Sequence, residues 1–553
     1  MTAPSRRRFV AGTITAGAAA GLAVAGVTPA LATPARRATG TGADTREAAA
    51  AGPAEDITPG DARYEDLANR GSNKRFTARP AAFRLATTTE EVVQAVGQAA
   101  RSGRRIAVRS GGHCYENFVG DSAVRLVVDL AQMNAVRYDE DKRAFMIEAG
   151  ARLMDVYKTL YYGWGVTLPG GASATVGLGG HITGGGYGAL SRRFGIAADH
   201  LYAVEVVVAD KAGRARAVVA TREPDDPHRE LWWAHTGGGG GNFGVVTRYW
   251  FRTPGATGTD PARQLPRPPA TVLTSALLFP REGMDKAAFR RLLRNHGLWH
   301  ERNSCADSPY AGLYGGLVLF GRLKQDDPGQ SAISFTHMDG TRPDAEKLLS
   351  DYTAALTEGV PVTPYDMGTT RDTWWNATVA LGESQDTDKG RQKIKSAYLR
   401  RAWTEAQIDA LYARLNDTDH SFESASVSLQ SYGGRVNTPH PSATATAHRD
   451  AVLNVIFMNT WQDAAGDARN IDWLRRAYRD VFATTGGVPV PGRGADGCYI
   501  NYPDVDMADP AWNTSGVPWQ RLYYKDNYPR LQRVKAAWDP RGVFGHELGI
   551  GPA

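Results

Sequence analysis

The sequence predicts an α+β fold built from two or three lobes. A chain of 553 residues is too long for one compact core, and its apolar fraction of 42% and charged fraction of 22% are typical of a globular protein. Strand-like and helix-like segments alternate irregularly, whereas a doubly wound parallel sheet requires regular strand–helix alternation. The irregular order therefore favours α+β layering.

The first 32 residues have the pattern of a twin-arginine export signal. Residues 5–10 are Ser-Arg-Arg-Arg-Phe-Val, an apolar run follows over 11–27, and Ala-Leu-Ala at 30–32 suits a signal peptidase. The apolar run is rich in Gly, Ala and Thr and is a poor membrane span; a disordered basic tail is the alternative. We expect the twin-arginine machinery to export the folded protein and a signal peptidase to remove residues 1–32, which gives a secreted protein with no stable membrane association.

Charge and cysteine content exclude several kinds of partner. Removal of residues 1–32 lowers the net charge from +6 to +3, and no stripe of Lys and Arg with interleaved aromatics is present. Nucleic acid is therefore not an expected partner. Cys114, Cys305 and Cys498 are too few for a disulfide framework, although one pair could form, and their spacing matches no metal site.

The elements follow in order after a flexible linker over 33–60, which is rich in Ala, Thr, Gly and Pro. Thr88 or Thr89 can cap a helix whose residues Val92, Val93, Val96 and Ala99 share one face. The patterns then predict strands at 105–109, 125–130, 145–149 and 204–208 and a helix at 153–161. Beyond a proline-rich boundary at 253–269, they predict helices at 285–300, 343–358 and 470–485 and strands at 272–278, 424–432 and 452–458.

Glycine accounts for 61 residues, and many of them cluster in three segments: 109–115 (Arg-Ser-Gly-Gly-His-Cys-Tyr), 168–188 and 237–247. Runs of glycine let successive N–H groups point into one concavity, as phosphate-binding loops require, although any single run could be a tight turn. None of the three fits the Walker or Rossmann fingerprint, so those two kinds of nucleotide site are excluded.

These segments resemble the flavin-binding domain of the vanillyl-alcohol-oxidase superfamily, and more narrowly the berberine-bridge-enzyme-like oxidases. The resemblance extends from about Arg79 to the C-terminus and includes the motifs at 499–504 (Tyr-Ile-Asn-Tyr-Pro-Asp) and 523–531. It implies a PCMH-type FAD-binding domain of two subdomains at 61–255 and an α/β substrate-binding domain with an antiparallel sheet at 256–490. A C-terminal segment at 491–553 is expected to return to the FAD domain.

The resemblance implies that a ring nitrogen of His113 is bonded to the 8α-methyl group of FAD. Imidazole is a neutral nucleophile near pH 7, so the residue type suits this bond, and the alternative is a loop histidine that only donates hydrogen bonds. Relatives often carry a second bond from a cysteine, but Ser173 stands at that position here. We predict a single 8α-histidyl link, since nothing in the sequence brings Cys114 to the flavin.

Two neighbouring residues have weaker interpretations. Ser173 is not a hydrolase nucleophile, because Thr175 stands where the G-x-S-x-G motif requires glycine. Valine at the position of Val176 accompanies oxidase behaviour in relatives, and packing is its alternative role. The resemblance also places flavin contacts in the glycine-rich segments and the C-terminal segment, at Arg109, Ser110, Gly111, Gly112, Cys114, Ser173, Val176, Gly177, Gly180, His181, Gly185, Tyr187, Gly241, Asn242, Gly244, Val246, Tyr499, Tyr502 and Asn527.

The resemblance assigns the catalytic base to Tyr499 and a supporting role to Tyr432, with Tyr502 ranked third. A free tyrosine has a pKa of about 10, so a base at neutral pH needs a positive charge or a strong donor beside it, which the sequence does not identify. Some relatives use a glutamate on the strand matching 453–461, but the corresponding residue here is Ile456. A glutamate base is therefore excluded.

The resemblance implies an FAD-dependent oxidase that takes a hydride from a sugar or glycosylated natural product to flavin N5, with oxygen as acceptor and hydrogen peroxide as product. One alternative is an oxidative cyclase or dehydrogenase of a secondary metabolite, and another is a flavin- or ligand-binding protein without turnover. The small-molecule or carbohydrate substrate is expected to contact the middle domain. Trp374 and Trp375 could stack on a sugar, although a core position is the stronger expectation.

Overall fold

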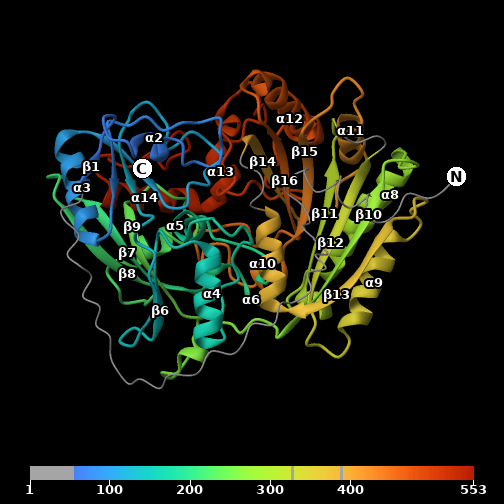
Figure 1. Cartoon of the computed structure of the whole chain (residues 1–553), viewed down its shortest axis with the longest axis horizontal. Helices are drawn as coiled ribbons and strands as arrows, with labels where there is room; N and C mark the ends of the chain where they lie inside the picture. The colour runs from blue at the N-terminus through green and yellow to red at the C-terminus, as the bar shows by residue number, and fades with distance from the viewer. Residues whose placement is uncertain (1–54, 325–328, 386–389) are drawn as a thin grey trace.

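The computed structural model describes residues 55–324, 329–385 and 390–553 (Figure 1). The predicted export signal at 1–32 lies outside the described residues. Among the helices described, none combines the length and the apolarity needed to cross a membrane. Three sheets form the framework, and helices and strands are not regularly alternated. The predicted α+β fold class is confirmed.

Two sheets make up the N-terminal half. A four-stranded sheet has the order β1-β2-β4-β3, in which β4 is parallel to both neighbours, and a five-stranded antiparallel sheet has the order β5-β6-β9-β7-β8. The strands are β1 (Asp56–Ile57), β2 (Ala82–Leu85), β3 (Arg105–Arg109), β4 (Val124–Asp129), β5 (Val136–Asp139), β6 (Ala144–Glu148), β7 (Leu201–Ala209), β8 (Ala215–Thr221) and β9 (Val245–Phe251). The helices are α2 (Tyr64–Ala68), α3 (Thr89–Ser102), α4 (Leu153–Trp164), α5 (Leu178–Thr183), α6 (Ser191–Phe194) and α7 (Arg229–Ala234).

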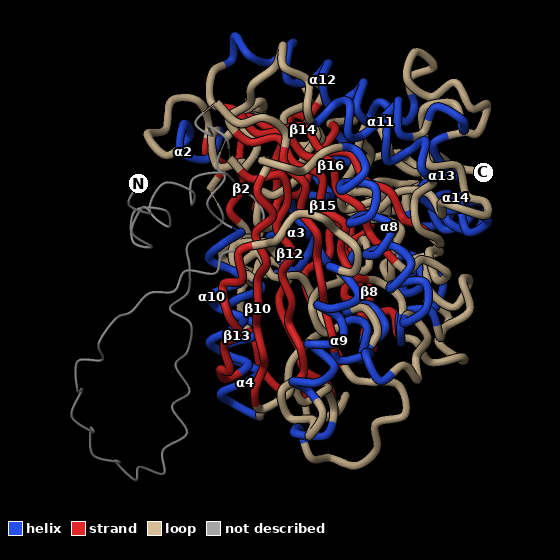
Figure 2. The backbone as a smooth tube through the Cα atoms, turned by 90° about the vertical axis from the view of Figure 1, so that its right-hand side faces the viewer, coloured by secondary structure: helices blue, strands red, loops and turns tan. Residues whose placement is uncertain are grey.

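A seven-stranded antiparallel sheet follows, with the order β13-β10-β12-β11-β15-β16-β14. Its strands are β10 (Thr271–Pro280), β11 (Leu313–Phe320), β12 (Gln330–Asp339), β13 (Tyr365–Thr373), β14 (Arg391–Leu399), β15 (Ser424–Ser431) and β16 (Leu453–Trp461). The helices of this half are α8 (Lys286–Asn303), α9 (Ala345–Thr357), α10 (Trp374–Gln385), α11 (Glu405–Leu415) and α12 (Asp467–Val481). In Figures 1 and 2, α8, α9, α11 and α12 cover the face of this sheet that points away from the N-terminal half.

Local signals explain the elements that the sequence predicted. Thr88 caps α3 in a reciprocal capping box with Glu91, and Val92, Val96 and Ala99 are buried, as the helix prediction requires. The strand predicted at 105–109 coincides with β3, while α12 begins three residues before its predicted start and ends at Val481. The proline-rich stretch lies between β9 and β10, where the chain passes from the five-stranded to the seven-stranded sheet.

The C-terminal segment returns to the N-terminal half (Figure 1) through α13 (Trp519–Tyr524) and α14 (Tyr528–Trp538). Phe544 forms a parallel bridge with Ile106, and the Arg105 guanidinium donates to the Gly545 carbonyl at 2.9 Å. Lys535 donates to the carbonyl of Asn242 at 2.6 Å, which ties α14 to the third glycine-rich segment. The tail therefore holds loops of the N-terminal half together, as the resemblance implied.

Candidate active site

A cavity of about 640 Å³ lies between the N-terminal half and the seven-stranded sheet. Its lining draws on all three glycine-rich segments, on residues 499–503 and on strands β14, β15 and β16. The lining includes every predicted cofactor residue except Gly185 and Asn527, and of the two predicted catalytic tyrosines it includes Tyr499 but not Tyr432. The fold therefore brings together residues from Asn69 to His546, which are 477 positions apart in the sequence.

The first two glycine-rich segments pack backbone against backbone. A Cβ placed on Gly111 would lie 2.2 Å from the amide nitrogen of Gly177, and a Cβ on Gly177 would lie 2.0 Å from Ser110 Oγ. No side chain fits at either position, so glycine is required there. Ser110 donates to the Ala149 carbonyl at 2.7 Å, and Arg109 pairs with Asp129 at 2.6 Å, which fixes the end of β3.

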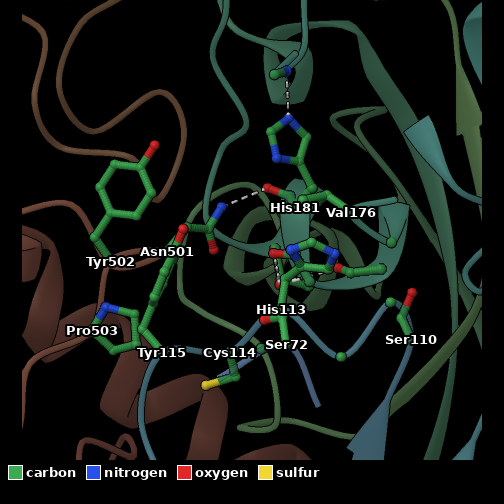
Figure 3. Close-up of a pocket in the computed structure, with 18 of the residues that line it drawn as sticks. Ser72, Ser110, His113, Cys114, Tyr115, Val176, His181, Asn501, Tyr502 and Pro503 are labelled. Atoms are coloured by element: carbon green, nitrogen blue, oxygen red, sulfur yellow. Dashed lines mark hydrogen bonds between the residues drawn. The ribbon is translucent and has the colours of Figure 1, made fainter. Parts of the chain in front are cut away.

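His113 follows this junction and is half-buried in the cavity wall (Figure 3). Its Nε2 lies 2.9 Å from Thr175 Oγ1, so a hydrogen bond joins the first and second segments at the predicted attachment point. Ser173 and Val176 line the same wall. Figure 3 shows the Cys114 sulfur pointing away from the His113 ring, and burial raises the pKa of this thiol to about 12. A protonated thiol is a poor nucleophile.

Other glycines leave room that a side chain would fill. A Cβ on Gly180 would meet nothing within 4 Å, one on Gly240 would meet only Thr183 at 3.2 Å, and one on Gly241 only His546 at 3.5 Å. Backbone beside such space can approach a phosphate group or a planar ring closely. The cavity volume also falls in the range of about 300–1,000 Å³ that is usual for cofactor sites. The residues present therefore fit a dinucleotide such as FAD.

Tyr499 presents its hydroxyl group to two hydrogen-bond donors. The backbone N–H of Gly186 donates to the phenolic oxygen at 3.1 Å, and the side-chain amide of Asn501 donates to it at 2.9 Å. Burial raises the pKa of Tyr499 above its ordinary value, whereas the hydrogen bonds from Asn501 and Gly186 lower it. Donors to the oxygen stabilise the deprotonated form. These two groups are the donors that the sequence analysis left unidentified.

Asn501 also ties Tyr499 to the second glycine-rich segment. Its amide donates to the His181 carbonyl at 2.9 Å, and His181 Nε2 accepts from the Gly171 N–H at 3.0 Å (Figure 3). Burial lowers the pKa of His181 to about 4, so its imidazole is neutral at pH 7 and can act as an acceptor. His181 therefore supports loop geometry and supplies no charge.

Tyr432, Gly185 and Asn527 lie behind the cavity wall. The Tyr432 ring is 1% exposed and packs edge-on against Tyr187, with ring centroids 5.6 Å apart. Asn527 donates to the carbonyl of Pro441 at 2.9 Å and is not among the residues that line the cavity, so its flavin contact stays a prediction. Gly185 adopts φ +111°, and a Cβ there would lie 2.7 Å from Thr446 Oγ1.

The sheet supplies a cavity wall with a polar and an apolar side. On β15, alternate residues Ser426, Ser428 and Gln430 line the cavity, as the period of two of a strand requires. On the neighbouring strand β16, Ile456 and Met458 line it instead. Trp374 is buried against Tyr161, with ring centroids 5.0 Å apart, and does not line this cavity, which matches the expected core position.

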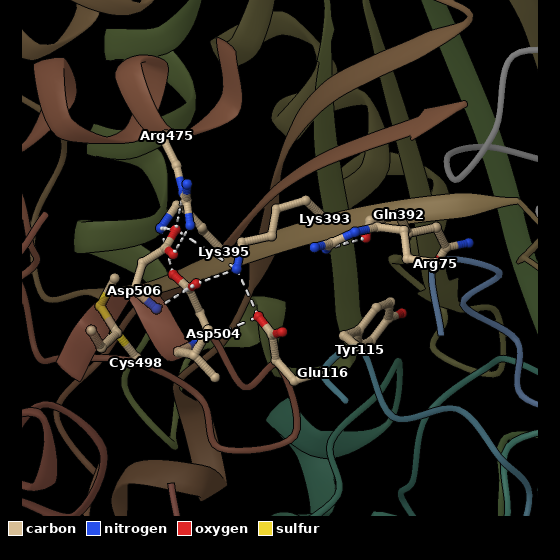
Figure 4. Close-up of polar contacts among 12 residues, drawn as sticks. Arg75, Tyr115, Glu116, Gln392, Lys393, Lys395, Arg475, Cys498, Asp504 and Asp506 are labelled. Atoms are coloured by element: carbon tan, nitrogen blue, oxygen red, sulfur yellow. Dashed lines mark hydrogen bonds and ion pairs between the residues drawn. The ribbon is translucent and has the colours of Figure 1, made fainter. Parts of the chain in front are cut away.

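A buried ion network connects the two ends of the site (Figure 4). Lys393 on β14 contacts Glu116 at 2.6 Å and Asp504 at 2.7 Å, and Lys395 contacts Asp504 at 2.6 Å and Asp506 at 2.7 Å. Glu116 is three residues after His113, and Asp504 is five residues after Tyr499. The network therefore fixes both loops to the same strand. The sequence interpretation missed it, because β14 contains charges in the middle of a buried strand.

Comparison with known proteins identifies the family. Residues 80–212 match a family model described as an FAD-binding domain, and residues 498–551 match one described as berberine and berberine-like. Aclacinomycin-N/aclacinomycin-A oxidase of Streptomyces galilaeus is 53% identical over 89% of both chains, and hexose oxidase of Chondrus crispus is 30% identical over 80% of this chain and 85% of its own.

Solved structures point to the same family. A glycopeptide hexose oxidase complexed with teicoplanin superimposes with a TM-score of 0.86 at 49% identity, covering 90% of this chain and 99% of its own. An aclacinomycin oxidoreductase gives a TM-score of 0.86 at 52% identity, with the same coverage. The fold, the residues that line the cavity and the similarity to these proteins all support the same family assignment. The chain belongs to the berberine-bridge-enzyme-like FAD-linked oxidases of the vanillyl-alcohol-oxidase superfamily, and it is an oxidoreductase that uses oxygen as acceptor.

Proposed function

We propose that this oxidase acts on a hydroxyl group of a sugar or a glycosylated natural product, with Tyr499 as the base and hydrogen peroxide as the second product. The observation that carries the proposal is the Tyr499 hydroxyl, which lines the cavity and accepts hydrogen bonds from Asn501 and Gly186. The similarity to a hexose oxidase and to an aclacinomycin oxidase supports the choice of substrate.

The geometry of Tyr499 suits removal of a proton from an alcohol. A neutral phenol accepts two hydrogen bonds and donates one, while a phenolate accepts three. Two acceptor positions are filled by Asn501 and Gly186, so the position of the departing phenol proton is the one that a substrate hydroxyl group can enter. Bound FAD supplies the hydride acceptor. Tyr499 then holds the alcohol proton, and the two donors keep its oxygen fixed.

The two-sided sheet wall favours a glycoside with an apolar part. Ser426, Ser428 and Gln430 offer hydrogen bonds to sugar oxygens, and Ile456 and Met458 offer apolar contact. A pocket of this kind fixes the orientation of a ligand by its few polar groups. We expect the sugar to lie along β15 and the apolar part of the substrate along β16.

The function is tested by incubating the purified enzyme aerobically with free sugars and with glycosides that bear apolar aglycones. We expect peroxide release with one carbonyl or lactone formed per peroxide. A product with a new ring and no carbonyl would instead indicate an oxidative cyclase. Flavin that is never reduced by any member of the panel would contradict an oxidase that acts on sugar hydroxyl groups.

We further propose that His113 carries the flavin through a single covalent bond. Peptide mapping of a tryptic digest is expected to place the flavin mass on residues 110–125, which contain His113 and Cys114. Because both residues share this peptide, the Cys114→Ser variant is the matched control and should retain covalent flavin, whereas His113→Ala should release all flavin on denaturation. Flavin that joins two peptides, or that leaves the unmodified protein on denaturation, would refute the single link.

Export through the twin-arginine pathway is proposed from residues 5–32 alone. A fusion of residues 1–60 to a reporter protein should reach the medium, and replacement of Arg6, Arg7 and Arg8 by lysine should retain the reporter in the cell. Secretion that survives these replacements would exclude the twin-arginine route.

A further inference from the structure

Gln430 is held in one orientation by three neighbours in the cavity wall. The hydroxyl groups of Tyr187 and Tyr314 both donate to its Oε1, at 2.9 Å and 3.0 Å. Its Nε2 donates to Ser428 Oγ at 3.3 Å. An amide nitrogen carries two hydrogens, so one N–H remains after the contact with Ser428. Gln430 is half-buried and lines the cavity, so the remaining N–H of this fixed amide can donate to a ligand in the cavity.

A single residue, Tyr187, connects the Gln430 amide to the proposed base Tyr499. The Tyr187 ring, whose hydroxyl group holds Gln430, packs edge-on against the Tyr499 ring with centroids 5.4 Å apart. Opposite Gln430 on β11 stands Gly316, and the Phe335 ring fills the place that a side chain at Gly316 would take, since a Cβ there would lie 2.3 Å from it. Tyr187 thus links the Gln430 amide to the Tyr499 ring, and all three residues line the cavity that a substrate would enter.

The hydrogen-bonding chemistry of the Gln430 N–H indicates which ligand group it binds. An amide N–H whose carbonyl side is already occupied by two tyrosines is a donor that cannot reverse its role, so it requires an acceptor. The oxygens of a sugar ring are acceptors placed one or two bonds from the oxidised carbon. Ligands that lack the matching polar group are rejected strongly by such sites, because the buried partner is left unpaired.

We propose that Gln430 is a specificity-determining residue, and that its Nε2–H donates to an oxygen of the sugar ring whose hydroxyl group is oxidised. This inference rests on the proposed function. Ser428 Oγ accepts a hydrogen bond from the Gln430 amide and lines the cavity, so its hydroxyl group can contact a neighbouring sugar oxygen. Gln430 takes no part in proton removal and acts through binding.

The Gln430→Glu variant tests the proposal on the holoenzyme. A carboxylate keeps acceptors for both Tyr187 and Tyr314 but has no N–H, so it removes the donor and keeps the wall. With the best glycoside of the panel, measured where the rate no longer changes with pH, we expect KM to rise by about 10- to 100-fold with little change in kcat. A deoxy analogue that lacks the contacted oxygen should give the same KM with both enzymes.

Further variants separate binding from packing. Gln430→Leu removes both roles and should be at least as impaired, and Ser431→Ala, on the opposite face of β15, should keep the wild-type KM. A normal KM in Gln430→Glu together with a poor Gln430→Leu would show that the residue only holds the tyrosines, and would overturn the inference while leaving the proposed function intact. A wild-type enzyme that oxidises no glycoside would overturn both.

Discussion

Replacement of Tyr499 by phenylalanine is expected to slow anaerobic flavin reduction by about 10²–10⁴-fold, because the proton of the substrate loses its acceptor. The absorption spectrum of the bound flavin should stay unchanged, since the Tyr499 ring remains and only its hydroxyl group is removed. Stopped-flow measurement at 450 nm separates the two quantities. A reduction rate equal to that of the wild type would exclude Tyr499 as the base.

Tyr502→Phe is the matched control for this variant. Tyr502 also lines the cavity, and its ring contacts that of Tyr499 with centroids 5.1 Å apart, but no hydrogen bond from Asn501 reaches it. We expect a much smaller effect on flavin reduction in Tyr502→Phe.

Because burial raises the pKa of Tyr499, the wild-type reduction rate should increase with pH as the phenol loses its proton, and Tyr499→Phe should lose this increase. Asn501→Leu should shift the increase to higher pH, since a donor to the phenolate is removed.

Replacement of Lys395 by methionine is expected to lower the free energy of unfolding by about 3–5 kcal/mol, the usual cost of leaving a buried charge without its partner. Lys395 is 1% exposed and contacts Asp504 and Asp506, which are equally buried. Burial alone would raise the pKa of Asp506, but Lys395 and Arg475 lower it below its ordinary value. Removal of Lys395 leaves these carboxylates with less compensation. Chemical denaturation followed by fluorescence measures the loss.

Lys324→Met provides the surface comparison. Lys324 is 53% exposed and lies 3.5 Å from Glu423, so the same substitution there should change stability by less than about 1 kcal/mol. Equal effects of the two substitutions would contradict a stabilising role for the buried network. Because the network positions the segment that contains Tyr499, Lys395→Met should also slow flavin reduction in the protein that remains folded.

Signals contained within one segment made much of the fold predictable. The α3 helix has its cap, its Glu91 partner and its apolar face within fifteen residues, and β3 is a short strand with Ile-Ala-Val between two arginines, directly before a glycine-rich loop. The glycine-rich segments at 109–115 and 168–188 were predicted to form a concave binding surface, and in the structure both line the cavity, with the backbones of Gly111 and Gly177 in contact. An element can be predicted from the sequence when the residues that stabilise it are its neighbours in the chain.

Strand β14 illustrates why the remainder was not predictable. Its sequence Arg-Gln-Lys-Ile-Lys-Ser-Ala-Tyr-Leu has charges at alternate positions, which argues against a buried strand. The acids that neutralise Lys393 lie 277 and 111 residues away, so no local pattern reveals them. The donor Gly186 lies 313 residues from Tyr499 for the same reason. Asn501 is different, because it stands inside the motif at 499–504 and its amide could have been considered as the donor.

One measurement tests the central claim most directly: anaerobic reduction of the bound flavin by a glycoside carrying hydrogen or deuterium on the carbon that bears the reactive hydroxyl group. If the chain oxidises that hydroxyl group with Tyr499 as base, the flavin should bleach, one carbonyl or lactone should form per flavin, and bleaching should be slower with deuterium. Bleaching at the same rate with both isotopes and without a carbonyl product, or no bleaching at all, would contradict the proposed function.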